Sequence, residues 1–251
     1  MKLDIILRTH DGGNRPVAPD TPRKVDVTKR EITLGCAYSL SKSIKLCNEE
    51  VNIFILDDHS SKKTVKALKK MFGVKVIPFK GKDYAGGALN HFTYSKNSNA
   101  DLIYSVEDDF LHKPEAISEL IETYYKFLDN IEPDMICLFP DDDYWNYTPP
   151  FGPVQTLIVP GVKRPWRMHT KTTNTFFTNP EVLRKYWEPF RLQATESLTN
   201  PKVNEETTIN VIWKKFVPLF TPLVPLAFHL DSWPPLFHKD AIAQLWEKNR
   251  Q

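Results

Sequence analysis

Short apolar runs that end in polar clusters recur through the first half of the chain. Such runs, which read as buried strands, cover residues 3–7, 51–56, 73–79, 102–106 and 135–139. The stretches between them predict helices over residues 29–48, 62–72 and 114–128, and a turn into a helix at residues 81–90. This alternation predicts an α/β fold with a mixed, mainly parallel sheet flanked by helices.

The alternation is lost after Pro140. Loops rich in proline and aromatic residues surround a short apolar segment at residues 175–178 and helices expected near residues 181–187 and 205–216. We therefore expect a looser C-terminal portion. The length of 251 residues fits one large domain, or two small lobes that share a sheet.

Polar residues follow directly where four of the expected strands end. These clusters span Arg8–Asp11, Asp57–Ser60, Glu107–Asp109 and Asp141–Asp143. In open α/β sheets, ligands bind beyond the carboxyl ends of the strands, so parallel strands would bring the clusters to one edge. Clustered carboxylates at Glu107–Asp109 suit Mg²⁺ or Mn²⁺. The acids at Asp141–Asp143 are a rival metal site. The chain has no GxGxxG after its first strand and no GxxxxGK[ST], which disfavours dinucleotide-binding and P-loop chemistry.

Composition narrows the class of protein further. A net charge of +2 argues against a non-specific nucleic-acid binder, although DNA as a substrate is not excluded. The three cysteines (Cys36, Cys47 and Cys137) form no CxxC pattern, so neither a disulfide framework nor a zinc site is expected. No run approaches the ~20 apolar residues of a membrane-spanning helix. We therefore expect a cytoplasmic protein without a membrane span.

The order of these motifs resembles the family-2-like glycosyltransferases of the GT-A fold. That family carries a "DDgS" turn and a "D-x-D-D" cluster with a proline downstream, and this chain has ILDDHSS and VEDDFLHKP. The opening IILRTHD is also similar to glycosyltransferases predicted in phage genomes. The resemblance covers about residues 3–132 well. It implies a single GT-A (Rossmann-like) catalytic domain over residues 1–251, with nucleotide-sugar binding in residues 1–132 and acceptor binding and catalysis in residues 133–251.

The resemblance also implies roles for individual residues on the donor side. Asp58 matches the acid that reads the uracil ring, and Asp109 matches the metal ligand. Glu107 stands where the family has its first Asp, as a ribose or metal contact. A late histidine implies His229 as a second metal ligand, with His238 in reserve. The full nucleotide-sugar-binding set is Arg8, Thr9, Asp11, Asp58, Gly87, Asn90, Glu107 and Asp108.

Catalytic residues are implied in the segment VNEETTINVIW, which resembles the family's "E-D-x-x-L" helix start. Glu206 matches the general base that deprotonates the acceptor, and Glu205 is its neighbour. A carboxylate at a helix N-terminus is stabilised by the dipole and stays ionised, as a base must. A capping role for both acids is an equal alternative. Basic residues at Arg15–Lys24 or Lys163–Arg167 are candidate clamps on the diphosphate.

These features predict a glycosyltransferase that uses Mn²⁺ or Mg²⁺. It would move a sugar from a UDP-linked donor to an acceptor hydroxyl with inversion. One hypothesis for the acceptor is a hydroxymethylated base of phage DNA, suggested by the aromatic and basic loops near residues 163–171; a glycan is another. A phage-encoded enzyme would act in the host cytoplasm. Two alternatives stay open: a sugar-phosphate nucleotidyltransferase, which the segment RTHDGGNRP faintly resembles, and a non-catalytic nucleotide-sugar-binding module.

Overall fold

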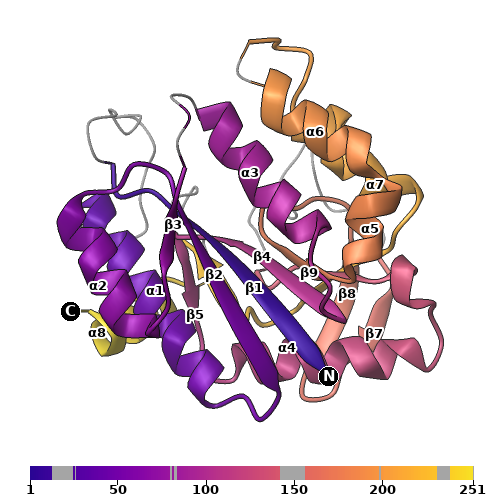
Figure 1. Ribbon diagram of the computed structural model, residues 1–251. Coiled ribbons are helices and arrows are strands. Elements are labelled where there is room, and N and C mark those ends of the chain that lie inside the picture. The colour runs from indigo at the N-terminus through magenta and orange to yellow at the C-terminus, as the bar shows by residue number, and fades with distance from the viewer. Residues whose placement is uncertain are drawn as a thin grey trace.

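A nine-stranded mixed sheet forms the centre of the protein in the computed structural model (Figure 1). The structure describes residues 1–12, 25, 27–79, 81, 84–141, 156–197, 199–230 and 238–250. The strand order is β3-β2-β1-β4-β9-β6-β10-β8-β7. Strands β9 and β8 run against the other seven, so the predicted mixed, mainly parallel sheet is confirmed.

The four parallel strands of the first half match the predicted runs. They are β1 (Lys2–Thr9), β2 (Glu50–Asp57), β3 (Val76–Pro78) and β4 (Leu102–Glu107). Strand β1 lies between β2 and β4, and all but its first residue are buried. The remaining strands are short: β6 (Cys137–Leu138), β7 (Ile158–Pro160), β8 (Pro165–His169), β9 (Phe176–Thr178) and β10 (Leu219–Pro222). Strand β9 pairs antiparallel with both β4 and β6 and joins the two halves of the sheet.

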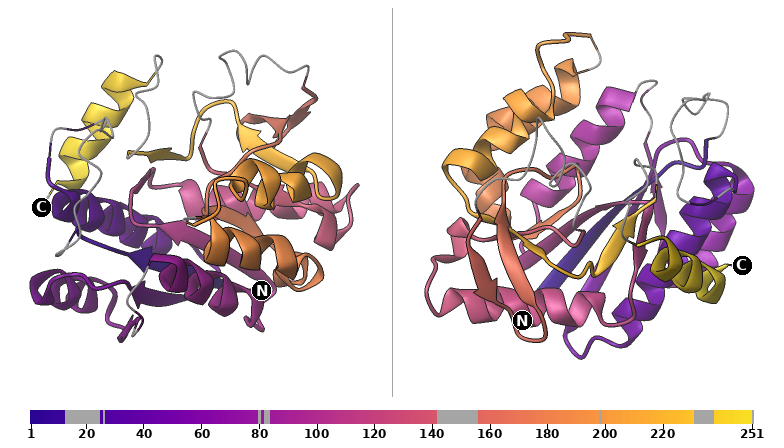
Figure 2. Two further views of the ribbon diagram at one scale, coloured as in Figure 1. Left: turned by 90° about the horizontal axis from the view of Figure 1, so that it is seen from above. Right: turned by 180° about the vertical axis from the view of Figure 1, so that it is seen from behind.

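Helices flank this sheet in two groups (Figures 1 and 2). Helix α1 (Lys29–Lys45) contacts α2 (Lys62–Phe72), α4 (Ala116–Leu128) and α8 (Lys239–Asn249). Helix α3 (Tyr84–Lys96) contacts α5 (Pro180–Lys185) and α6 (Trp187–Glu196), and α6 contacts α7 (Ile209–Lys215). Within the described residues, no helix is both long and apolar enough to cross a membrane.

Local sequence explains where the helices near the polar edge begin and end. Helix α1 starts at a capping box, in which Thr28 and Glu31 satisfy each other's backbone N–H groups. Helix α2 is capped by Ser61 and ends at Gly73, which adopts the left-handed φ of 69°. The helix predicted over residues 205–216 is divided: residues 205–207 form a 3₁₀ turn, and α7 begins after Thr208.

A second, two-stranded sheet extends the polar edge of the large one. Strand β5 (Phe110–His112) follows β4 after two residues and pairs antiparallel with β11 (Ala227–His229). In this pairing His229 lies opposite Phe110. The ribbon therefore brings the C-terminal part of the chain beside Asp108 and Asp109, the two residues between β4 and β5.

Candidate active site

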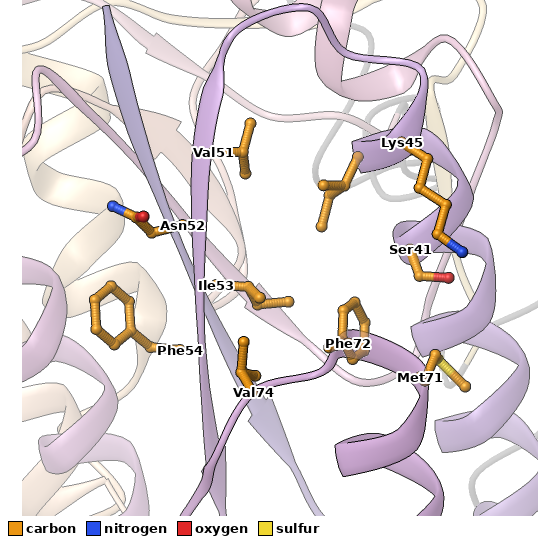
Figure 3. Close-up of a pocket in the computed structure, with 10 residues that line it drawn as sticks. Ser41, Lys45, Val51, Asn52, Ile53, Phe54, Met71, Phe72 and Val74 are labelled. Atoms are coloured by element: carbon orange, nitrogen blue, oxygen red, sulfur yellow. The ribbon is translucent and has the colours of Figure 1, made fainter.

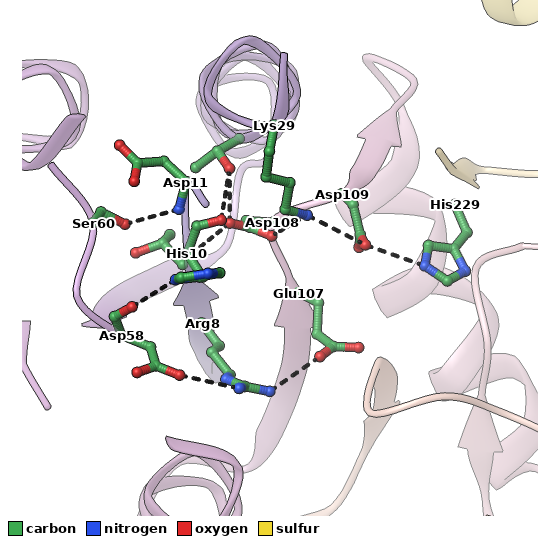
Figure 4. A network of polar contacts seen from close by, with 12 residues as sticks. Arg8, His10, Asp11, Lys29, Asp58, Ser60, Glu107, Asp108, Asp109 and His229 are labelled. Carbon is green, nitrogen blue, oxygen red and sulfur yellow. Dashed lines mark hydrogen bonds and ion pairs between the residues drawn. The ribbon is translucent and has the colours of Figure 1, made fainter. Parts of the chain in front are cut away.

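Three parallel strands end side by side at one edge of the sheet. Arg8 of β1 lies opposite Leu56 of β2 and Glu107 of β4, and Thr9 lies opposite Asp57. This register brings the first three polar clusters together, as expected for the ligand-binding edge of an open α/β sheet (Figure 4).

Arg8 joins two of these clusters through buried ion pairs. Its Nη2 donates to Asp58 Oδ2 at 3.3 Å, and its Nη1 donates to Glu107 Oε1 at 3.4 Å. Helix α3 approaches this pair at Gly87, where a Cβ atom would lie 2.6 Å from Asp58 Oδ2 and 3.4 Å from Arg8 Nη2. A side chain at position 87 would therefore collide with the Asp58 carboxylate.

The Glu107 side chain is 18% exposed, more than those of Asp108 and Asp109, and it has two polar partners in the protein. Burial raises the pKa of its carboxyl and the nearby Asp109 charge raises it further, whereas Arg8 and a hydrogen bond from Asn174 lower it. The Nδ2 group of Asn174 donates to Glu107 Oε1 at 3.2 Å. Glu107, the predicted ribose or metal contact, is thus held between the Arg8 guanidinium and the Asn174 amide.

Asp108 turns toward helix α1. Its Oδ2 accepts hydrogen bonds from the His10 backbone N–H (2.6 Å) and the Thr33 hydroxyl (2.8 Å), and its Oδ1 lies 3.1 Å from Lys29 Nζ. These hydrogen bonds and the ion pair use both oxygens of the Asp108 carboxylate within the protein. Asp108 therefore ties the loop after β1 to helix α1.

Asp109 and His229 lie next to each other across the β5–β11 ribbon. Asp109 Oδ2 is 3.3 Å from His229 Nε2 and 3.6 Å from Lys29 Nζ. The His229 ring stacks on Phe110 at 4.7 Å between centroids, and its backbone N–H donates to Asp141 Oδ2. Although burial alone would raise the pKa of the Asp109 carboxyl, the charges of His229 and Lys29 hold it below its usual value.

One oxygen of Asp109 makes this pair a plausible fit for a cation. Asp109 Oδ1 is buried and accepts no hydrogen bond from the described residues. A carboxylate and an imidazole suit Mn²⁺ or Mg²⁺ when other oxygens complete the shell. The described part of the chain contains no group of three or more His, Cys, Asp or Glu side chains that could hold a metal. Asp109 and His229 therefore offer two protein ligands, and further ligands would have to come from a bound molecule.

Thr9 and Asp11, two of the predicted donor-binding residues, bond to the loop that precedes α2. Thr9 Oγ1 donates to Asp57 Oδ1 at 3.0 Å. The Asp11 carboxylate accepts hydrogen bonds from the Ser61 backbone and hydroxyl and from the Thr64 hydroxyl at 2.6 Å. Asp11 thus stabilises the start of α2.

The predicted base, Glu206, lies in the 3₁₀ turn before α7. Its Oε1 is 2.8 Å from Lys171 Nζ, and its Oε2 accepts a hydrogen bond from Lys214. Partial burial raises the pKa of Glu206, but the hydrogen bonds from the two lysines outweigh it and lower the pKa overall. Asn210 also donates to Glu206, at 3.4 Å, and accepts from the Thr172 N–H at 3.0 Å.

Residues 172–175 connect this turn to the acid cluster. Thr172 bonds to Asn210 near Glu206, and two residues later Asn174 bonds to Glu107.

The other predicted residues lie in or next to elements already described. Glu205 lies in the same 3₁₀ turn as Glu206. Asn90 is part of α3, one turn beyond Gly87. The reserve ligand, His238, lies just before α8, with its ring 5.7 Å from that of Phe228.

Several predictions fall outside the described residues. These are the basic loop Arg15–Lys24, the acids Asp142 and Asp143, and the aromatic residues Tyr144, Trp145, Tyr147 and Trp233. Of the rival acid cluster, Asp141 is described. It is buried and binds the His229 backbone, so it supports the β11 strand.

Among the residues that contact the cluster, sequence reasoning missed Lys29, Thr33 and Asn174. Lys29 is the first residue of α1, where a positive charge opposes the helix dipole. This unfavourable position could have marked Lys29 as a functional residue. The sequence does not show its partners, Asp108 and Asp109, which lie about 80 residues away. Asn174 lies in a loop with no periodicity, and nothing in the sequence pattern marks it.

A pocket of about 530 Å³ lies away from this edge (Figure 3). It is lined by the first half of β2, including Val51 and Ile53, and by the ends of α1 and α2, including Ile44 and Phe72. Strand β2 ends at Asp57 on the other side, and Asp58 follows directly after it. The pocket is therefore separate from the polar cluster.

Comparison with known proteins gives one family. The model of the family described as "Glycosyl transferase family 2" matches residues 31–192, which is more than half of the chain. A search of curated proteins found no match.

Three solved structures share the fold at low identity. Staphylococcus aureus TarS is 12% identical (TM-score 0.52), over 89% of this chain and 37% of its own. Glucosyl-3-phosphoglycerate synthase from Mycobacterium tuberculosis, in complex with Mg²⁺ and UDP, is 10% identical (TM-score 0.51), over 98% of this chain and 75% of its own. CMP:2-keto-3-deoxy-manno-octonic acid synthetase, complexed with CTP, is 12% identical (TM-score 0.52), over 99% and 100%. This chain thus spans little more than a third of the TarS chain, and the likenesses show the fold alone.

Proposed function

Because the chain belongs to glycosyl transferase family 2, we propose that it transfers a sugar from a nucleotide-sugar donor to an acceptor hydroxyl. One observation carries the proposal beyond family membership. At the edge of the sheet where a ligand is expected, Asp109 Oδ1 is buried and accepts no hydrogen bond from the described residues, and the other oxygen of this carboxylate lies 3.3 Å from His229 Nε2. A buried carboxylate oxygen without a partner costs free energy, so a bound cation is the simplest reason for its position.

The donor that we propose is UDP-linked. M. tuberculosis glucosyl-3-phosphoglycerate synthase, which has this fold, was solved with Mg²⁺ and UDP. In this chain Asp58 and Glu107 would contact the nucleoside, and the close approach of Gly87 leaves the Asp58 carboxylate room at the start of α3. Arg8 would hold both carboxylates in place, since it donates to each of them.

Asp109 and His229 would hold Mn²⁺ or Mg²⁺. When bound, such a cation neutralises the charge that develops on the leaving diphosphate. The Lys29 charge also lowers the pKa of Asp109, so this carboxylate is ionised, and His229 would bind the cation as the neutral imidazole. Stacking on Phe110 and the bond from the His229 backbone to Asp141 fix the imidazole on its side of the site.

Glu206 is our candidate for the general base, and a base that activates the acceptor directly gives inversion. Its lowered pKa means that it is ionised at neutral pH and can accept a proton. Lys171 and Lys214 hold the carboxylate in one orientation. Glu205, in the same turn, is the alternative base.

For the acceptor, we compare two classes of molecule, modified DNA and a glycan. DNA with hydroxymethylated bases would need free cations near residues 163–171, and two of those cations are paired within the protein. Arg164 binds the buried Glu119 at 2.7 Å, and Lys171 binds Glu206 at 2.8 Å. These pairings favour a glycan acceptor, which needs less positive surface than DNA does.

A donor screen tests the proposal. UDP-sugars are incubated with the protein and a panel of glycan and modified-DNA acceptors, with and without EDTA, and released UDP is measured. We expect release from at least one donor that EDTA abolishes. Asp109→Asn should abolish release without unfolding the protein, whereas Asp134→Asn removes a surface acid paired with Lys185 and should change nothing. Full activity of Asp109→Asn at saturating donor would refute the metal assignment.

A sugar-phosphate nucleotidyltransferase is the second function that we consider, because CMP:2-keto-3-deoxy-manno-octonic acid synthetase shares the fold over 99% of this chain and 100% of its own. That match concerns the fold. A nucleotidyltransferase would release pyrophosphate from labelled UTP or CTP in the presence of a sugar phosphate. Pyrophosphate release in that assay, with no transfer from UDP-sugars, would favour this function over the first.

A further inference from the structure

A buried lysine lies between two of the acids of the site. Lys29 Nζ is 3.1 Å from Asp108 Oδ1 and 3.6 Å from Asp109 Oδ2, and its side chain is only 11% exposed (Figure 4). No role was expected for this residue, because it belongs to the start of α1 and not to any of the four polar clusters.

The position of Lys29 is unfavourable unless its charge is needed there. It is the first residue of a 17-residue helix, whose N-terminal end carries a partial positive charge. Burying an ammonium group also costs solvation free energy. The contacts with the carboxylates of Asp108 and Asp109 offset both costs. The helix start itself is stabilised without it, because Thr28 and Glu31 form the capping box.

Two basic side chains of the protein, Arg8 and Lys29, pair with different acids of the cluster. Arg8 binds Glu107 at 3.4 Å, and Lys29 binds Asp108 and Asp109. Asp108 is also fixed by His10 and Thr33, so Lys29 has one anchor that does not depend on Asp109. The ammonium can therefore stay on Asp108 while its weaker contact, with Asp109, is broken.

We propose that Lys29 is a resident counter-cation of the acidic tip, which competes with the divalent cation for Asp109. Before the cation binds, Lys29 offsets the repulsion between Asp108 and Asp109. When the cation binds, Lys29 gives up Asp109 Oδ2 and keeps Asp108 Oδ1. Because the two positive charges then lie close together, the cation binds weakly by itself and tightly only with the donor diphosphate. This inference rests on the proposed function, since it assumes that Asp109 is a cation ligand.

Calorimetric titration with MnCl₂, with and without UDP, tests the competition directly. Lys29→Gln should bind Mn²⁺ about tenfold or more tightly than the wild type when UDP is absent, because a repelling unit charge has been removed. UDP should increase the Mn²⁺ affinity of the wild type more than that of the variant. Lys45→Gln is the matched control. It removes one charge from the exposed end of the same helix and should bind Mn²⁺ as the wild type does.

Thermal unfolding in the absence of metal tests whether Lys29 stabilises the two acids. In EDTA, Lys29→Gln should lower Tm by at least about 2 °C, because two adjacent carboxylates lose their shared partner, and Mn²⁺ should restore part of that loss. Lys29→Met carries the same expectation and serves if the Gln variant does not fold. Equal or weaker Mn²⁺ binding by the variants, in the absence of UDP, would overturn the inference. So would a lack of binding by every protein. Both readouts are independent of sugar transfer, so an inactive but Mn²⁺-binding wild type would count against the proposed function alone.

Discussion

Replacing Gly87 with alanine tests whether close packing of α3 sets the position of Asp58. Gly87 lies in the first turns of α3, and a Cβ atom there would lie 2.6 Å from Asp58 Oδ2 and 3.0 Å from its Cγ. Ordinary contact with a Cβ atom begins at 3.4 Å, so the carboxylate must move by about 0.8 Å. The Arg8–Asp58 contact is already 3.3 Å long, and a shift of that size can take it out of hydrogen-bond range.

Two opposing terms keep the effect of Gly87→Ala on stability small. Overpacking costs about 1–3 kcal/mol, whereas alanine in place of glycine within a helix gains about 1 kcal/mol. The net loss of unfolding free energy should therefore be about 0–2 kcal/mol. Binding is the sharper measurement. Misplacing a carboxylate that accepts a hydrogen bond from the nucleotide should cost about 1.5–3 kcal/mol, or roughly 10- to 150-fold in Kd for UDP.

The assay is calorimetric titration with UDP, together with thermal unfolding of each variant. Gly35→Ala is the matched control, because its Cβ atom would lie 2.7 Å from the Trp246 ring, on the contact between α1 and α8. It should lower Tm and leave the Kd for UDP unchanged. If Gly87→Ala binds UDP as tightly as the wild type does, Asp58 does not depend on this contact or does not bind the nucleotide.

Three further predictions concern other parts of the site and the core. His59 has a left-handed φ of 65°, so His59→Gly should be more stable than His59→Ala by about 1 kcal/mol in chemical unfolding; equal stabilities would show that the turn relaxes. Glu206→Gln should lower kcat by about 10²–10⁴ with the Kd for UDP unchanged, and an unaltered kcat would leave Glu206 with a structural role only. Burial lowers the pKa of His91 to about 3, below the 6.5 of an exposed histidine. The unfolded chain therefore takes up the proton first, and stability present above pH 6.5 is lost as pH falls toward 3. At pH 5 the loss from His91 should be about 2 kcal/mol, which His91→Gln should remove in urea titrations; the same slope in both proteins would contradict this.

The first half of the fold could be predicted because each strand there is a continuous apolar run. Strands β1 and β4, for example, are buried along nearly their whole length, and each ends at a polar cluster. The second half gives no such signal. Strands β6 and β9 have two and three residues, and β9 enters the sheet between β4 and β6 against their direction. Pairing of that kind is decided by contacts far apart in sequence, which periodicity does not report.

The acids of the candidate site could be predicted, but not what each of them contacts. Asp11 and Asp108 follow strands in the same way as Asp58 and Asp109 do. Yet Asp11 binds Ser61 at the start of α2, and Asp108 binds the loop after β1 and helix α1. Residue type and spacing do not distinguish an acid that ties loops together from one that faces a ligand. Their partners do, and those partners lie 50 to 99 residues away.

The balance of charge at this edge argues for an added cation. Four carboxylates, those of Asp58, Glu107, Asp108 and Asp109, meet two permanent cations in the described contacts, Arg8 and Lys29, and His229 adds a charge only when it is protonated. Burial and, after it, the Asp109 charge raise the pKa of Glu107 and so act against its ionisation. A divalent cation at Asp109 would offset the remaining charge and favour ionised Glu107 as well. Metal binding and the ionisation of Glu107 would thus be coupled through Asp109, whose charge raises the pKa of Glu107.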